Sequence, residues 1–148
     1  FATVHPVAPS DPRPEFKKQV QAEFNQRTQS NIQWIKQAFA LAKEKKSTAM
    51  VFAWHSWLFS RSGVPGKPHS RFITAFLNEA KNYPGEILII HGDAHAYILD
   101  KPFVAHQNIT RMEVFGSPYT IAVKVSVDVT AKEMFKFSPI GPLLEARE

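Results

Sequence analysis

The side chains best suited to chemistry lie in one short stretch, where an apolar run ends in two imidazoles and a carboxylate. His91, Asp93 and His95 follow the run Ile87–Ile90, with Gly92 allowing a sharp turn among them. Imidazole and carboxylate groups are ligands that Mn, Fe, Co and Zn accept, and they also perform acid and base chemistry. The stretch therefore predicts a metal site or an acid/base site.

A further histidine stands at the end of a second apolar run. Thr48–Trp54 is rich in apolar and aromatic residues and leads directly into His55. The carboxyl ends of buried parallel strands meet at one edge of a sheet, where α/β proteins commonly bind ligands. One histidine after a strand is more often structural, but two of them with Asp93 and His95 beside one favour a shared site.

The elements that must position these residues predict an α/β (α+β) fold. Helical spacing extends from Glu15 to Lys46, and Ser30 with Gln33 resembles a capping box, which leaves open a break into two helices there. The helical face containing Trp34, Ile35, Ala38 and Phe39 is expected to pack in the core. A second helix is expected over Pro68–Asn82.

The strands are expected to change character along the chain. Ala2–Val4, Thr48–Trp54 and Glu86–Ile90 predict a mainly parallel or mixed sheet. After Ala96 the pattern alternates with period two, which predicts an antiparallel meander. Its strands are expected at Ala96–Leu99, Ile109–Val114, Thr120–Val127 and Met134–Phe137.

Length and composition limit the function classes. The 148 residues predict a single domain or half-domain, with an extended tail over 139–148. The first residues, Phe1–Val4, already resemble a strand, so an amino-terminal part is expected to be missing or separate. There is no Cys, which excludes disulfides and thiolate chemistry, and no apolar run long enough to span a membrane. The composition does not fix the compartment, whether cytoplasmic, periplasmic or secreted.

The formal charge of +5 favours an anionic partner. Three of the positive charges, Lys43, Lys45 and Lys46, are expected to lie at a solvated helix end. No Arg-rich tract or basic stretch interleaved with aromatic residues is present. Nucleic acid is therefore the less favoured partner.

The strand-terminal His55, followed after a helix by Gly92-Asp93-Ala94-His95, resembles the last two metal-ligand motifs of calcineurin-like metallophosphoesterases. Wider features are similar to the carboxyl-terminal part of an uncharacterised bacterial branch of that superfamily. These features are Trp34, Ala38, His91–Tyr97, Asp100–Pro102, Asn108–Arg111, Phe115–Pro118 and Val125–Asp128. The resemblance covers nearly the whole chain, and its weight comes from the order and spacing of the motifs.

The resemblance implies a fold and a reaction. The chain would be the carboxyl-terminal half of a β-sandwich flanked by helices. Two divalent ions, Mn, Fe, Zn or Co, would lie about 3.5 to 4 Å apart and activate a water for attack on a phosphate monoester or diester. His55 and Asp93 would serve one ion and His95 the other. Asp93 and His91 are the expected catalytic residues, with His91 orienting a ligand or touching substrate.

Two departures from the family pattern affect this interpretation. Asp93 stands where the superfamily usually has His, so an oxygen ligand or an acid/base carboxylate replaces an imidazole. The Asp-x-His, Gly-Asp-x-x-Asp and Gly-Asn-His motifs that precede the strand-terminal His in the family do not occur before His55 in this sequence. We therefore expect the activity to belong to the complete protein, with the missing amino-terminal half as a partner and this chain inactive alone.

Three alternatives stay open. The chain could be a non-catalytic phosphoesterase-like module that binds an anion or a partner protein, which would be favoured if His55 and Asp93 point into salt bridges instead of a shared cavity. It could be a basic interaction domain for nucleic acid, which would show a continuous Lys/Arg stripe. The histidines could also be purely structural residues at strand ends.

Overall fold

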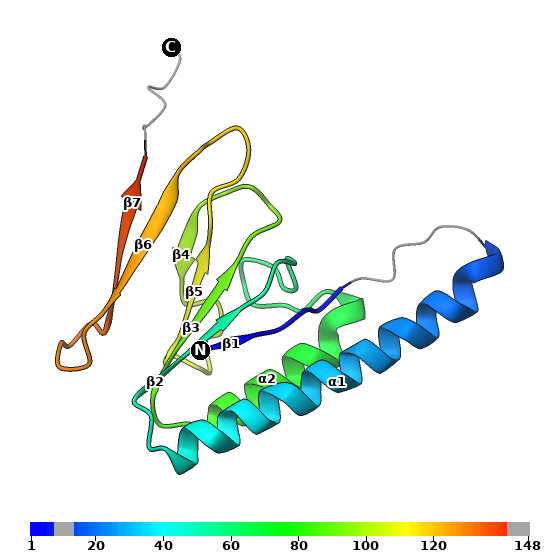
Figure 1. Cartoon of the computed structure of the whole chain (residues 1–148), viewed down its shortest axis with the longest axis horizontal. Coiled ribbons are helices and arrows are strands. Elements are labelled where there is room, and N and C mark those ends of the chain that lie inside the picture. Colours follow the sequence, from blue (N-terminus) through cyan, green and yellow to red (C-terminus); the bar gives the residue numbers. More distant parts are fainter. Residues whose placement is uncertain (8–13, 142–148) are drawn as a thin grey trace.

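The computed structural model describes residues 1–7 and 14–141, and its mixed α and β content confirms the predicted α/β class. Two α-helices, α1 (Lys17–Glu44) and α2 (Ser70–Lys81), lie side by side along one side of the main sheet (Figure 1). Among the described residues, no helix is long and apolar enough to cross a membrane. Short 3-10 helices precede the two α-helices, at Pro14–Phe16 and Lys67–His69.

Helix α1 is continuous because one buried stripe extends along most of its length. The helix passes through Ser30, so the break considered there does not form. The helix ends at Glu44 with Lys45 as its C-cap, and the next residue, Lys46, has a left-handed φ of 51°. The Ser47 N–H then donates to the Ala42 carbonyl at 2.9 Å. The buried side chains recur every three or four residues, at Phe24, Thr28, Ile32, Ile35, Phe39 and Ala42.

The prediction that Trp34 packs in the core is wrong. Ile35 and Phe39 are fully buried and Ala38 packs against the core, as predicted, but Trp34 is 50% exposed. Each helical residue is rotated by about 100° from the one before it, so Trp34 turns away from the buried stripe. Its indole N–H donates to the Thr3 carbonyl at 3.0 Å, over the edge of the sheet.

The main sheet has five strands in the order β1-β2-β3-β5-β4. Strands β1, β2, β3 and β5 are parallel, and β4 pairs antiparallel with β5 at the edge. The carboxyl ends of the four parallel strands therefore lie at one edge of the sheet. The five strands are β1 (Ala2–Thr3), β2 (Ala49–Ala53), β3 (Glu86–His91), β4 (Ile98–Asp100) and β5 (Ile109–Glu113).

The prediction of one antiparallel meander after Ala96 is wrong. Strand β5 inserts beside β3 in parallel register, with His91 opposite Glu113. The last two strands form a separate sheet. Parallel strands are commonly buried on both faces, and in β5 the buried residues include Arg111 and Glu113. These polar residues give β5 the alternating pattern that is typical of a half-exposed antiparallel strand.

The last two strands, β6 (Ala122–Val127) and β7 (Phe135–Ile140), pair as an antiparallel hairpin. Figure 1 shows the hairpin on the opposite side of the main sheet from α1 and α2. Pro139 and Ile140 belong to β7, so the prediction that an extended tail starts at residue 139 is wrong for these two residues. Residues 142–148, the rest of that predicted tail, lie outside the described residues.

The core lies between the two helices and one face of the main sheet. Because side chains alternate along a strand, Phe52 of β2 and Ile87 and Ile89 of β3 share this face, and all three are fully buried. The ring of Phe52 lies 5.2 Å from that of Phe39 in α1, centroid to centroid. On the other face Val51 is half-buried, whereas its pairing partner Leu88 in β3 is fully buried.

Candidate metal centre

The loop after β2 and the turn after β3 lie next to each other. Pairing between the two strands continues past their ends, since the Trp54 N–H donates to the Ile90 carbonyl at 3.1 Å. One step further, the Gly92 N–H donates to the His55 carbonyl at 3.1 Å. Two backbone hydrogen bonds therefore bring His55 beside the turn that contains Asp93.

His55 and Asp93 approach each other at this edge of the sheet. The distance from His55 Nε2 to Asp93 Oδ1 is 4.0 Å, and the two side chains are 79% and 51% exposed. The other carboxylate oxygen, Oδ2, accepts the Trp57 N–H at 3.1 Å. That bond fixes the carboxylate while leaving Oδ1 open toward solvent and the imidazole.

His95 lies on the same turn, but its ring makes a different contact. Its Nδ1 is 3.2 Å from the Ser117 carbonyl oxygen. Because a carbonyl only accepts, Nδ1 carries the proton and Nε2 is left as the nitrogen that could bind a metal. The ring lies tightly against Gly116, where a Cβ would come within 2.7 Å of His95 Cγ. The loop after β5 therefore sets the orientation of this imidazole.

His91 is buried and does not face an open site. His91 is only 2% exposed. Its Nδ1 lies 3.0 Å from the Gly92 carbonyl oxygen, and its ring makes an edge contact with the ring of Phe59. Burial lowers the pKa of His91, although the bond to Gly92 opposes this effect. This placement argues against contact with substrate. A role in orienting a ligand stays a prediction.

The residues present fit part of a metal-ligand set. Two ligand atoms that share one ion at about 2 Å lie roughly 3 to 4 Å apart, and the His55–Asp93 distance of 4.0 Å is at the upper end of that range. His95 does not join them, since the described residues contain no group of three or more His, Asp or Glu side chains placed to hold one ion. The pair also has the geometry of a weak, solvent-exposed ion pair.

Glu113, which the sequence analysis did not select, contacts the same turn. It ends β5 as a fully buried residue, and its Oε1 accepts the Ala94 N–H at 2.9 Å. Burial raises the pKa of Glu113, while the Ala94 bond and the charge of Arg111 oppose that change. The available sequence signal was that Glu113 is the one acidic residue within the predicted strand Ile109–Val114.

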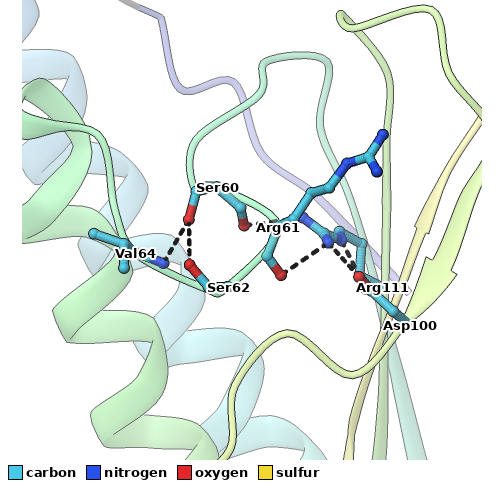
Figure 2. Close-up of polar contacts among 6 residues, drawn as sticks. All are labelled: Ser60, Arg61, Ser62, Val64, Asp100 and Arg111. Atoms are coloured by element: carbon cyan, nitrogen blue, oxygen red, sulfur yellow. Dashed lines mark hydrogen bonds and ion pairs between the residues drawn. The ribbon is translucent and has the colours of Figure 1, made fainter.

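Arg111 is a second residue that was not among the predicted site residues and that contacts a segment next to the site. It is fully buried, and its Nε donates to Asp100 Oδ1 at 2.8 Å while a second nitrogen pairs with Oδ2. It also donates to the carbonyls of Ser60 at 3.2 Å and Arg61 at 3.4 Å, and its guanidinium lies 5.3 Å from the Phe59 ring centre. Figure 2 shows that the Arg61 side chain extends away from the buried pair. Arg111 therefore ties the loop after β2 to β5.

No protein-family model matches this chain, and no curated protein or solved structure matches it. The resemblance to calcineurin-like metallophosphoesterases thus rests on the sequence motifs named above.

Proposed function

We propose that this chain contributes the carboxyl-terminal ligands of a metal-dependent phosphoesterase that hydrolyses a phosphate monoester or diester. The approach of His55 and Asp93 to 4.0 Å, from the ends of two parallel strands, carries the proposal. Their donor atoms, imidazole nitrogen and carboxylate oxygen, suit Mn, Fe, Zn or Co. The remaining ligands would come from polypeptide outside these 148 residues.

Each residue has a defined task in this proposal. His55 and Asp93 would hold one ion, and the Trp57 N–H keeps the Asp93 carboxylate oriented toward it. His95 would hold the second ion through Nε2, because the Ser117 carbonyl engages its Nδ1. A divalent ion supplies charge that stabilises phosphoryl oxygens and lowers the pKa of bound water.

A non-catalytic binding module for an anion or a partner protein is the second candidate. Two observations favour it: His55 and Asp93 are within ion-pair distance, and no larger ligand group occurs among the described residues. In that case the exposed His55–Asp93 pair would contribute little to stability or to metal binding.

Metal titration separates the two candidates. We expect calorimetry to show weak Mn²⁺ or Zn²⁺ binding by the 148-residue chain, abolished by Asp93→Ala and weakened by His95→Ala. Binding is weak because two ligands at one ion and one ligand at the other leave most positions to water, and the ligands must lose any bound protons. A His106→Ala variant, which changes a histidine away from the site, should bind as the unmodified chain does. An unmodified chain that binds neither ion would favour the binding module.

The catalytic part of the proposal needs the complete protein. We expect the isolated chain not to hydrolyse an aryl phosphate diester, whereas the complete protein does so with a divalent metal. The complete protein should lose that activity on Asp93→Ala or His95→Ala. Strong metal-dependent turnover by the isolated chain would contradict this assignment of the catalytic unit.

A further inference from the structure

Glu113 is a buried carboxylate whose position is not explained by packing. It is fully buried at the end of β5, directly opposite His91 in the parallel pairing. One oxygen accepts the Ala94 N–H at 2.9 Å, and the other is buried with no hydrogen-bond partner in the described part of the chain. Burying a carboxylate with an unpaired oxygen destabilises a fold, so an apolar residue would serve stability better.

The turn that Glu113 reaches has a backbone that requires outside support. Asp93 and His95 have φ angles of 88° and 58°, in the left-handed region that residues with a Cβ rarely adopt. The side chains of both residues are held from outside, by the Trp57 N–H and the Ser117 carbonyl. Ala94 lies between them, and its N–H is held by Glu113.

The geometry points to Glu113 as a positioning residue for the Asp93–His95 turn, which sets the directions of the two candidate ligands through the backbone of Ala94. This inference rests on the proposed function, because it treats Asp93 and His95 as metal ligands. Glu113 itself touches neither substrate nor metal in this role. Groups that orient metal ligands in this way commonly change metal affinity by about 10- to 100-fold when they are replaced.

Two substitutions separate the hydrogen bond from the volume of the side chain. Glu113→Gln keeps an oxygen that can accept the Ala94 N–H, whereas Glu113→Met has a similar length and no comparable acceptor. We expect Glu113→Met to weaken Mn²⁺ binding about 10-fold or more in calorimetry, and Glu113→Gln to stay within about 3-fold of the unmodified chain. Ile109→Ala, at the other end of β5, is the control: it should lower the melting temperature and leave Mn²⁺ affinity unchanged.

A purely structural role gives a different result. In that case Glu113→Met would reduce thermal stability and metal affinity together, as a general loosening of the fold does. We expect instead that Glu113→Met keeps or raises the melting temperature, because it removes a buried carboxylate, while metal affinity falls. Unchanged Mn²⁺ affinity in Glu113→Met would overturn the inference.

A second measurement keeps this inference separate from the proposed function. If the unmodified chain binds no Mn²⁺, the proposed metal site fails, but the positioning role can still be judged in the metal-free protein by NMR. Glu113→Met should shift the Ala94 amide signal upfield and speed its hydrogen exchange at least 10-fold, and Glu113→Gln should do neither. Equal Ala94 signals and exchange rates in all three proteins would refute the role of Glu113.

Discussion

Removing Asp100 should destabilise the chain more than removing Arg111, its partner in the buried ion pair. The Arg111 side chain is 0% exposed, whereas that of Asp100 is 34% exposed. Asp100→Ala would therefore leave a guanidinium charge buried with only the carbonyls of Ser60 and Arg61 as acceptors. Breaking a buried pair in this way costs about 3 to 5 kcal/mol, and we expect about 3 kcal/mol because the two carbonyls remain.

Arg111→Met leaves a different situation. The Asp100 carboxylate is already partly exposed and can be hydrated, so the loss comes mainly from the hydrogen bonds to the Ser60 and Arg61 carbonyls. We expect a loss of about 2 kcal/mol. The double variant should also lose about 2 kcal/mol rather than the additive value of about 5, because no unpaired charge stays buried.

Urea unfolding followed by tryptophan fluorescence measures all three free energies of unfolding. The partly exposed Lys43–Glu79 pair, with 3.9 Å between its charged atoms, provides the control. Glu79→Ala should change the free energy of unfolding by less than about 1 kcal/mol. The reasoning fails if Asp100→Ala is no more harmful than Glu79→Ala, or if the effects of the two substitutions in the buried pair simply add.

Three further outcomes are expected. Burial lowers the pKa of His91 and His69 below the ordinary histidine value of 6.5. As the pH falls below 6.5, the unfolded chain therefore takes up protons at these histidines more readily than the folded chain does. The free energy of unfolding should accordingly decrease below pH 6.5. Urea midpoints at about pH 7.5 and 5.5 check this, and His91→Gln should reduce the difference. Gly116→Ala should push the His95 ring from its place, since the new Cβ would lie 2.7 Å from Cγ, and Mn²⁺ titration should show weaker binding. Trp34→Phe loses one hydrogen bond to β1 and should cost about 1 kcal/mol in urea unfolding, and no loss would show that the bond is immaterial.

The elements that could be predicted from the sequence are those whose burial leaves a local pattern of apolar residues. The run Ile87–Ile90 is apolar at every position, and a strand covered on both faces requires this. The meeting of His55 and Asp93 followed from the same reasoning, because parallel neighbouring strands end at one edge. Local periodicity and strand direction were sufficient for these conclusions.

Features that depend on distant partners could not be predicted in this way. Arg111 alternates with apolar neighbours, as a solvent-facing residue does, and only its pairing with Asp100 and the loop carbonyls permits its burial. The insertion of β5 beside β3 likewise depends on register between segments about twenty residues apart. The orientation of His95 is fixed by Ser117, which follows it by 22 positions, and no pattern near His95 reports that contact.

Strand β5 contains no candidate ligand, yet it is bonded to both segments that carry the candidate ligands. Arg111 holds the carbonyls of Ser60 and Arg61 in the loop that follows His55, and Glu113 holds the turn that contains Asp93 and His95. Two positions apart on one strand, these two side chains share a face, so any shift of β5 moves both segments together. The distance between the His55 loop and the Asp93 turn therefore depends on contacts from β5 as well as on the direct pairing of β2 with β3. This connection gives a reason for the buried carboxylate of Glu113, a position where an apolar residue would serve stability better.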